Sequence, residues 1–403
     1  MSSKRKKKTA TKKPPLKKKK KKDEPAAIVL PPTTESTPNP SLPDDLLISC
    51  FARVSILYYP TLSLVSKSFR SLIASPELYK TRSSIGHTEI SLYVCLKFHP
   101  DPIPRWFTLC RKPNQTITTN DDDAATKLKN KRKKKPIGYA LAKIQAPHSG
   151  SSSWSRSTSL VTIGSEIYNI GGPIDDDDND RSSNVSILDC RSNTWREGPN
   201  MLVKRAYTDA NVVDGKIYVA GGCSDGFFKD CDSPSDWMEV FDPKTQAWEI
   251  VPSQGAKICG CKVGKSAGAD GKLYMFGDNG LSYEPRTGRW EYLSFDMDYN
   301  WVWFSFCVVG DVLYMFDENV FKWYDGKAGI WRVVKGMKGL PKIPMVVLWE
   351  RVVAYKEKLI LCAVIALERL SDEEIWGKVE WYDTVLTVDN KSCRVEYALG
   401  VTV

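Results

Sequence analysis

The spacing of apolar residues divides the chain into a polar start, a short helical stretch and a long β region. Residues 1–40 are rich in Lys, Pro and Thr and poor in apolar side chains. Burial therefore cannot offset the entropy of ordering them, and we expect a disordered tail. Residues 41–86 carry apolar side chains at helical spacing, whereas residues 90–403 show the alternation of β-strands.

Three short helices are expected in residues 41–86. The first opens near Pro43, with Asp44 and Asp45 at its positive end, and the third opens at Pro76. The second is predicted from an apolar stripe that steps by three or four residues, namely Leu62, Val65, Phe69 and Leu72. So small a unit buries little surface by itself, which indicates that a partner completes it.

Four tight hairpin turns recur along the β region, and a Tyr follows each of them closely. The turn pairs are Gly164-Ser165, Asp214-Gly215, Asp270-Gly271 and Gly310-Asp311. Asp-Gly pairs favour type I′ turns, whereas a leading Gly favours type II′ turns. Both types close two-residue hairpins, so the repeated unit begins with a pair of antiparallel strands.

A second recurring feature lies downstream of each hairpin, where an acid precedes a Trp by six residues with turn-forming residues between them. The four indoles belong to Trp195, Trp248, Trp290 and Trp331. They recur 53, 42 and 41 residues apart, a spacing typical of four-stranded propeller blades. One indole at a fixed place in each repeat predicts a structural packing role rather than ligand stacking.

These repeats predict an all-β propeller of five or six blades, and we favour six. Whole repeats occupy residues 160–200, 205–252, 265–295 and 305–335. Partial blades at 90–110 and 345–403 would supply the remaining strands. The two ends of the region would then close one sheet together.

The net charge of +10 is concentrated in the tail, where residues 1–22 hold twelve Lys, one Arg and no acid. The rest of the chain is slightly acidic overall, which argues against specific nucleic-acid binding. The basic runs Lys4–Lys8 and Lys17–Lys22 resemble nuclear import signals, which an import receptor would bind. We therefore expect a nuclear location, with the cytoplasm as a second site and a merely solvating tail as the alternative. A further run, Lys127–Lys135, is interpreted as an exposed loop insertion.

The sequence gives little support for metal binding or for membrane contact. The pair Cys259 and Cys261 lacks the second pair or the His residues that a zinc site needs, so we expect no metal and no cofactor. The acidic run Asp175–Asp178 lacks the alternation of a calcium loop. The longest apolar run, Leu359–Leu367, is roughly half the length of a membrane span, so no membrane contact is expected.

Two segments of the helical stretch resemble the F-box. Residues 41–47 contain its Leu-Pro-x-x-Leu opening, and residues 62–72 contain its Val-Ser-Lys-x-aromatic-Arg centre. The resemblance implies docking on a Skp-type adaptor and, through that adaptor, on a cullin. The residues that it implies for this contact are Leu42, Pro43, Leu46, Leu47, Val65, Phe69 and Leu72.

The β region resembles kelch repeats, since two of its hairpins end in a glycine doublet that a distant Trp follows. The doublets are Gly171-Gly172 and Gly221-Gly222, and they weaken to Gly277-Asp278 and Asp317-Glu318 in later copies. The chain as a whole resembles the plant F-box/kelch-repeat family, from residue 41 to residue 403. The implied fold is a kelch-type β-propeller that follows a small all-α F-box module.

The resemblance implies a non-enzymatic substrate receptor of an SCF-type (Skp–cullin–F-box) ubiquitin ligase. Its unknown protein target would bind the loops that vary between repeats, of which Pro173–Asn184 and Cys223–Trp237 are the candidates. Copper oxidases also use kelch propellers, but residues 149–403 hold no His for such a site. The alternative is a nuclear kelch-propeller interaction scaffold without ligase activity.

Overall fold

Residues 43–403 form one compact unit, most of which the computed structural model describes. The described residues are 42–101, 104–112, 138–144, 159–172, 181–223, 236–253, 263, 265–276, 279–294, 305–317, 320–337, 347–354, 357–389 and 393–403. Several sequence predictions fall outside these ranges: the tail with its basic runs, Lys127–Lys135, Asp175–Asp178 and the pair Cys259 and Cys261.

The helical module contains four α-helices rather than three. They are α1 (Asp44–Phe51), α2 (Tyr59–Leu62), α3 (Lys67–Ile73) and α4 (Pro76–Ser84), with a 3₁₀ turn η1 (Ile56–Tyr58) after α1. The predicted second helix breaks because Ser66 is extended and its hydroxyl caps α3, accepting from the Phe69 amide at 3.0 Å. None of the described helices is long and apolar enough to cross a membrane.

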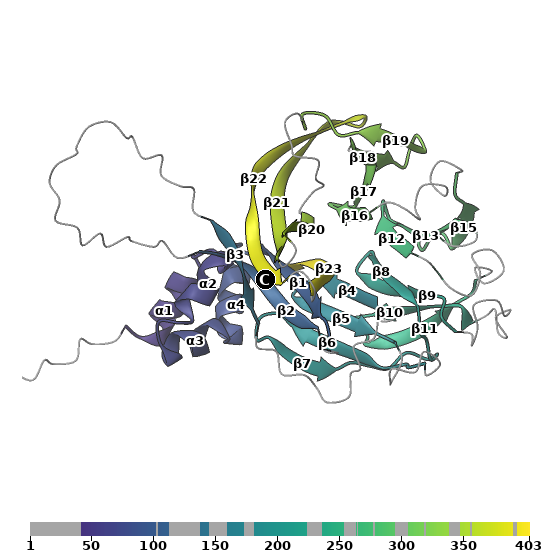
Figure 1. Cartoon of the computed structure of the whole chain (residues 1–403). Helices are drawn as coiled ribbons and strands as arrows, with labels where there is room; N and C mark the ends of the chain where they lie inside the picture. The colour runs from purple at the N-terminus through teal and green to yellow at the C-terminus, as the bar shows by residue number, and fades with distance from the viewer. Residues whose placement is uncertain are drawn as a thin grey trace, which may run out of the picture. The chain divides into compact units, whose positions relative to one another are not determined.

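The β region is a propeller, as the repeats predict (Figure 1). Five sheets have four strands each and are numbered here as blades 1 to 5, and a sixth sheet has three strands. Blade 1 contains β23 (Cys393–Thr402), β1 (Ile90–Phe98), β2 (Arg105–Arg111) and β3 (Tyr139–Lys143). Blade 2 contains β4 (Ser159–Ile163), β5 (Glu166–Ile170), β6 (Val185–Asp189) and β7 (Thr194–Glu197).

The other sheets follow in chain order. Blade 3 contains β8 (Asp209–Val213), β9 (Lys216–Ala220), β10 (Met238–Asp242) and β11 (Ala247–Val251). Blade 4 contains β12 (Lys265–Ala269), β13 (Lys272–Phe276), β14 (Leu281–Glu284) and β15 (Arg289–Tyr292). Blade 5 contains β16 (Ser305–Val309), β17 (Val312–Asp317), β18 (Val320–Asp325) and β19 (Ile330–Val333). The sixth sheet contains β20 (Val347–Ala354), β21 (Glu357–Ser371) and β22 (Glu374–Asp389).

Blade 1 joins strands from the two ends of the propeller region, which confirms the predicted closure. β23 pairs antiparallel with β1 from Ile90 opposite Thr402 to Phe98 opposite Cys393. First strands of successive blades also contact one another, β23 with β4, β4 with β8, β8 with β12 and β12 with β16. These strands are therefore the innermost ones.

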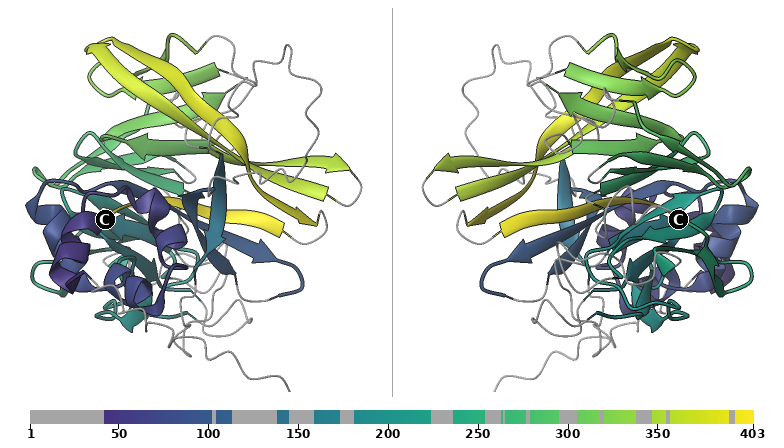
Figure 2. Two further views of the ribbon diagram at one scale, coloured as in Figure 1. Left: turned by 90° about the vertical axis from the view of Figure 1, so that its left-hand side faces the viewer. Right: turned by 90° about the vertical axis from the view of Figure 1, so that its right-hand side faces the viewer.

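The long β21–β22 hairpin ties the sixth sheet to both of its neighbours (Figure 2). Towards blade 5, the Lys335 amide donates to the Ile375 carbonyl and the Gly377 amide donates to the Lys335 carbonyl, both at 2.9 Å. Towards blade 1, the Trp381 ring stacks on Tyr139 with centroids 4.0 Å apart. The three-stranded sheet thus bridges the last and first blades.

Three of the four hairpin turns have the turn type that their sequences predict. Asp214-Gly215 and Asp270-Gly271 have positive φ at both positions, as type I′ requires, and Gly164 is positive alone, as type II′ requires. The type II′ prediction for Gly310-Asp311 is wrong, because φ is 56° and 63° at these two residues. Aspartate tolerates the left-handed region through local hydrogen bonding, so the pair adopts the I′ pattern.

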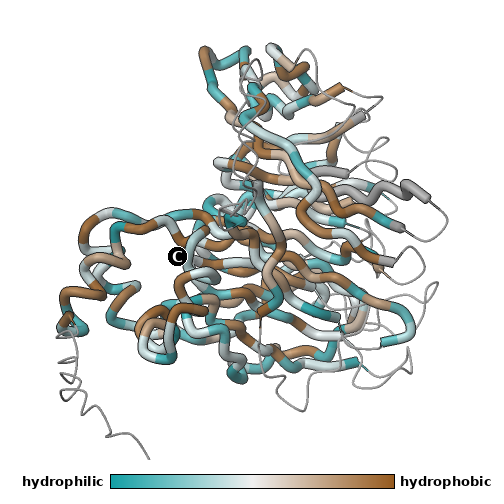
Figure 3. The backbone as a smooth tube through the Cα atoms, turned by 60° about the vertical axis from the view of Figure 1, so that its left-hand side comes forward, coloured by the Kyte–Doolittle hydropathy of each residue, from teal (hydrophilic) through white to brown (hydrophobic). Residues whose placement is uncertain are grey.

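The four repeated indoles lie on the outermost strands of blades 2 to 5. Trp248, Trp290 and Trp331 each stand opposite an aromatic residue of the preceding strand, at centroid distances of 5.0, 4.6 and 5.2 Å. Trp195 stands opposite Leu188 in blade 2. Such cross-strand pairs stabilise a sheet. Figure 3 shows that hydrophobic (brown) and hydrophilic (teal) residues alternate along much of the backbone.

Candidate functional site

The antiparallel register gives the propeller two distinct ends. One, here the turn face, carries the tight turns Gly164-Ser165, Asp214-Gly215, Asp270-Gly271 and Gly310-Asp311. The other, here the loop face, carries the first residues of the innermost strands, including Ser159, Asp209 and Lys265. The register supports this division, because Ser159 pairs with Ile170 and Asp209 pairs with Ala220, just before the glycine doublets. The loops after the doublets therefore leave from the loop face.

The helical module packs on the turn face of blades 1 and 2. One hydrophobic cluster combines Phe51, Ile56 and Leu78 of the module with residues of both blades and of β23, including Trp106, Leu160, Leu188, Val401 and Val403. The Glu89 amide donates to the Val403 carbonyl at 2.9 Å, and the Thr402 amide donates to the Gly164 carbonyl at 2.9 Å. The propeller itself therefore completes one side of the module, which the sequence interpretation had left to a partner.

A buried arginine stabilises the helical module beside its contact with the propeller, here called the joint. Arg82 of α4 donates to the Val54 carbonyl at 2.7 Å, the Ala52 carbonyl at 3.2 Å and the Tyr59 hydroxyl at 3.0 Å. It also forms an ion pair of 3.1 Å with Glu89, whose carboxylate accepts from the Ile56 amide at 2.7 Å. Sequence reasoning missed Arg82, although its position four residues after the buried Leu78 on α4 was an available signal.

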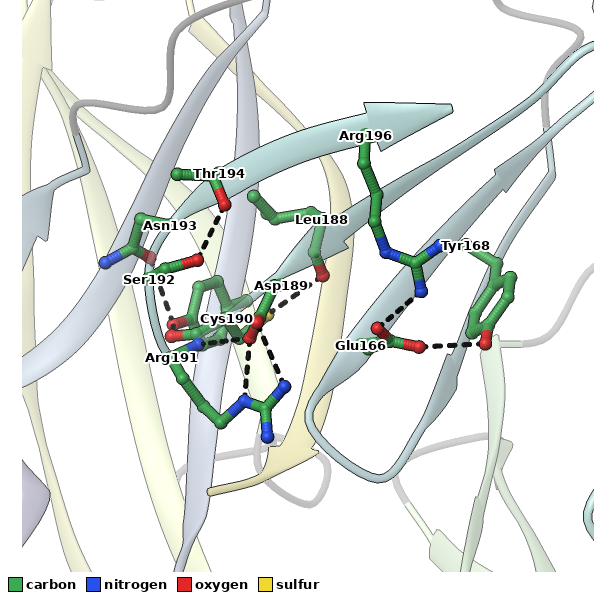
Figure 4. A network of polar contacts seen from close by, with 11 residues as sticks. Glu166, Tyr168, Leu188, Asp189, Cys190, Arg191, Ser192, Asn193, Thr194 and Arg196 are labelled. Atoms are coloured by element: carbon green, nitrogen blue, oxygen red, sulfur yellow. Dashed lines mark hydrogen bonds and ion pairs between the residues drawn. The ribbon is translucent and has the colours of Figure 1, made fainter. Parts of the chain in front are cut away.

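The turn between β6 and β7 carries a polar network beside the joint (Figure 4). The Tyr93 hydroxyl of β1 donates to the Cys190 carbonyl at 2.7 Å and so links blade 1 to blade 2. Burial raises the pKa of the Tyr93 phenol, which keeps it protonated as a donor. The Arg191 guanidinium beside Asp189 forms an ion pair of 2.9 Å, and its hydrogen bonds lower the pKa of that carboxyl against the opposing effect of burial.

The predicted adaptor-docking residues divide into two groups. Leu42, Leu46 and Val65 are 57%, 51% and 63% exposed, Pro43 is also exposed, and the neighbouring Leu64 is 77% exposed. Large apolar side chains that are exposed on so small a module are typical of an interaction surface. The sequence interpretation did not include Leu64.

Leu72 is assigned differently by the structure, because its side chain is 8% exposed and belongs to the shared hydrophobic cluster. Phe69 and Leu47 are half-buried and pack against the same cluster, with the Phe69 ring edge-on to Phe51 at 4.9 Å. Leu72 therefore serves the core of the chain itself, and its assignment to the adaptor contact stays a prediction. It and Val65 were placed on one stripe, but only Leu72 lies on a helix.

On the loop face, a second buried arginine anchors the segment that links blade 2 to blade 3. Arg205 and Glu239 form an ion pair of 2.8 Å, and both side chains are 0% exposed. The guanidinium also donates to the Gly221, Trp237 and Asp236 carbonyls at 2.7, 2.9 and 2.6 Å. Glu239 accepts from the Leu202 amide at 2.9 Å. Every part of this charge pair therefore has a partner.

The glycine doublets lie against this linking segment. The Gly172 amide donates to the Arg205 carbonyl at 3.2 Å, and the Ala206 amide donates to the Gly222 carbonyl at 3.0 Å. A Cβ on Gly222 would lie 2.3 Å from the Ala206 carbonyl oxygen, so no other residue fits there. The doublets thus allow blade ends to approach the linking segment closely.

The candidate recognition loops are described only at their ends, which are residues 181–184, 223 and 236–237. Arg181 donates to the Cys223 carbonyl, which connects the end of one loop to the start of the other. Both loops therefore start and finish beside the linking segment. Within the described parts of the chain, no group of His, Cys, Asp and Glu is arranged to hold a metal ion.

Asp209 lies where β8 begins at the loop face. Its carboxylate accepts from the Ser159 hydroxyl at 3.3 Å and the Ala210 amide at 3.1 Å. Burial raises the pKa of this carboxyl to about 6, although these bonds and those from Ser266 oppose the shift. The group therefore titrates in a range where carboxylates are normally ionised.

Replacing Asp209 with asparagine is expected to flatten the pH dependence of stability. Because the folded pKa of about 6 exceeds the usual 3.8, the folded chain binds more protons between these limits, and the free energy of unfolding falls as pH rises through them. The effect should be on the order of 1–3 kcal/mol. Thermal unfolding midpoints measured across this window test it, and equal slopes for variant and wild type would contradict it.

Comparison with known proteins accounts for both parts of this architecture. A model of the F-box domain matches residues 40–81, which cover most of the helical module. The family model described as FKB95, Kelch-repeats domain matches residues 106–386, more than half of the chain. The chain belongs to the plant F-box/kelch-repeat family. Its helical module is therefore an F-box, and its blades are kelch repeats.

Relatives share the whole F-box/kelch-repeat architecture. F-box/kelch-repeat protein At4g39550 of Arabidopsis thaliana is 56% identical over 385 residues, which cover 91% of this chain and 95% of the relative. F-box/kelch-repeat protein At5g51250 of the same plant is 47% identical over 375 residues, covering 88% and 98%. A solved structure titled Structure of YjhT matches 52% of this chain and 72% of its own at 13% identity, and its TM-score of 0.33 is too low to carry an argument.

Membership of the F-box/kelch-repeat family gives the chain the general role of an F-box substrate adaptor. The F-box implies binding to a Skp-type adaptor, and the kelch propeller binds substrate proteins. F-box/kelch-repeat proteins are typically non-catalytic adaptors.

Proposed function

We propose that this chain is the substrate receptor of an SCF-type ubiquitin ligase. The F-box would dock on a Skp-type adaptor bound to a cullin, and the propeller would hold the target. The observation that carries this proposal is the set of exposed apolar side chains Leu46, Leu64 and Val65 on a module whose core is shared with the propeller. A Skp-type adaptor would bury these side chains.

The exposed apolar side chains would contribute substantially to the free energy of such a contact. Burying a Leu side chain contributes roughly 1.5–3 kcal/mol, so several half-exposed residues together can offset part of the cost of association. Arg82 supports the same role, because it ties the F-box to Glu89, the residue directly before β1, whose amide bonds to the Val403 carbonyl. Target and adaptor would then keep a constant relative position, with the target on the loop face and the adaptor beyond the turn face.

Replacing Leu46 with aspartate is expected to abolish co-purification with a Skp-type adaptor. A charged side chain at a buried contact loses the apolar burial and adds a desolvation cost, so affinity should fall by about 100-fold or more. The full chain is the proper test material, since residues 41–86 share their core with the propeller.

The matched control is Leu202→Asp, because Leu202 is similarly exposed but lies on the linking segment of the loop face. It should retain the adaptor, and both variants should unfold at the wild-type temperature. Undiminished capture by the Leu46 variant would remove the basis of the ligase role and favour a propeller scaffold without ligase activity.

We also propose that the protein is imported into the nucleus through its basic tail. The support is the sequence alone, in which Lys4–Lys8 and Lys17–Lys22 form two runs without an acid between them. Replacing the lysines of both runs with serine should move a fluorescent fusion of the full chain from nucleus to cytoplasm. A nuclear signal that survives this change would end the proposal and leave the tail as a solvating segment.

A further inference from the structure

A cavity lies on the turn face between blades 4 and 5. Its volume is about 190 Å³, roughly ten times or more the space that one water molecule needs. Turn residues of the two blades and the end of the β21–β22 hairpin line it, and they include the aspartates Asp270, Asp311, Asp325 and Asp372. The lining also includes three aromatic rings, those of Tyr274, Trp323 and Tyr324.

Two of these aspartates are paired within the chain. Asp372 accepts from the Lys327 ammonium at 3.0 Å. Asp325 accepts from the Arg332 guanidinium at 2.8 Å and from two backbone amides of its own turn, both at 3.1 Å. The charges of these two carboxylates are therefore already compensated.

Asp270 and Asp311 lie on adjacent turns, because the Asp270 amide donates to the Asp311 carbonyl at 3.0 Å. Both side chains are exposed, and neither forms an ion pair with any residue that the structure describes. The remaining cation of the lining, Arg369, donates instead to the Ser371 and Asp372 carbonyls at 3.2 and 3.3 Å. Negative charge therefore remains at these two turns.

Blade 3 shows which group the equivalent aspartate binds. Asp214 is the counterpart of Asp270, since each opens an Asp-Gly turn, with φ of 49° and 51°. The Asp214 carboxylate accepts two bonds from the Arg286 guanidinium of blade 4, at 2.9 and 3.1 Å. Lys327 of blade 5 corresponds to Arg286, because each stands four residues before the repeated Trp, but it pairs with Asp372. Within the described chain, Asp270 thus lacks the guanidinium that its counterpart has.

Two further features of the lining suit a ligand. A Cβ on Gly326 would lie 2.5 Å from the Asp270 Oδ2, so glycine lets this carboxylate approach the blade 5 turn. Trp323 is 1% exposed, and its indole N–H has no hydrogen-bond acceptor among the described residues. Buried polar groups are normally hydrogen-bonded, so an acceptor from outside the chain is expected beside this ring.

We propose that this cavity binds an arginine side chain of a partner protein. The guanidinium would lie against the Asp270 and Asp311 carboxylates, and the tyrosine rings would contact its planar face. A main-chain carbonyl of the same segment would accept from the Trp323 indole.

This site goes beyond the proposed receptor function, because it belongs neither to the F-box nor to the loop face. Blade 3 on one side and the sixth sheet on the other separate blades 4 and 5 from the blades that contact the F-box. An arginine bound here therefore leaves the adaptor surface accessible.

The test uses the full chain, with short random peptides displayed on phage as the probe. Clones that bind the wild type but not Asp270→Asn should contain Arg. For synthetic copies, replacing this Arg with Gln or the protein's Asp270 with Asn should each weaken binding by about tenfold. The two losses should not add, since both remove the same contact. Asp311→Asn repeats the measurement at the second carboxylate.

The matched control is Asp214→Asn, which removes the equivalent carboxylate in blade 3 and should bind the peptides as the wild type does. Asparagine tolerates the left-handed region, so all three variants should unfold at the wild-type temperature. The proposal fails if no selected clone depends on Asp270, if the dependent clones lack Arg, or if the two losses add in full.

Discussion

Replacing Arg205 with methionine is expected to destabilise the propeller by about 3–5 kcal/mol, a large part of the stability of a typical domain. The variant leaves the Glu239 carboxylate buried without its counter-charge, and three backbone carbonyls lose their donor. An uncompensated buried charge is among the most costly defects that one substitution can create. Urea unfolding followed by tryptophan fluorescence measures the loss as a lower midpoint.

A second-site change separates charge from packing in this experiment. Adding Glu239→Gln to the Arg205 variant removes the unpaired charge and keeps an acceptor for the Leu202 amide, so the double variant should be more stable than Arg205→Met alone. The control is Arg286→Met, which removes a solvent-exposed pair with Asp214 and should leave the midpoint unchanged. A double variant less stable than Arg205→Met would show that the charge is not the dominant cost.

Replacing Arg82 with methionine should loosen the F-box from the propeller and weaken adaptor capture without touching the docking residues. The change removes the donor for the Ala52 and Val54 carbonyls and the ion partner of Glu89, at a cost of about 2–4 kcal/mol. Limited proteolysis of the full chain should then cleave the F-box first and leave a resistant propeller. The cleavage pattern and the adaptor captured are both measured.

Lysine should not rescue this position, because one ammonium group cannot match the planar spread of acceptors around the Arg82 guanidinium. The control is Arg70→Met in α3 of the same module, where the guanidinium is exposed and donates to the Ser63 carbonyl at 3.3 Å. If Arg82→Met resisted protease as well as this control does, the joint would not depend on Arg82.

The sequence could predict those parts of the fold that depend on residues close together in the chain. The pairs Asp214-Gly215 and Asp270-Gly271 each encode a two-residue hairpin, and the indole that follows marks the last strand of the blade. The 15-residue strand β21 has no such mark, so it was not predicted. Its pairing with β22 is interrupted by register shifts, which alternation of side chains cannot reveal.

Residues whose role depends on partners far away in the sequence were harder to predict. Arg205 meets Glu239 across 34 positions of sequence, and nothing in its own neighbourhood indicates burial. The spacing of Leu72 and Val65 predicted one apolar stripe. Spacing alone, however, does not show which of these side chains pack inside the protein and which are exposed to a partner. Ser66 did offer a local signal, since a serine three residues before Phe69 can cap a helix there.

Closure of blade 1 by β23 has a consequence for synthesis of the protein. During translation the F-box emerges early, but its core includes Val401 and Val403, which leave the ribosome hundreds of residues later. A chain cut short before β23 lacks the closing strand of blade 1 and part of the propeller-side cover of the F-box. Since the same strand completes both parts, an unfinished receptor lacks a fully assembled docking module. The order of the strands thus delays completion of the F-box core until the last strand of the propeller has been made.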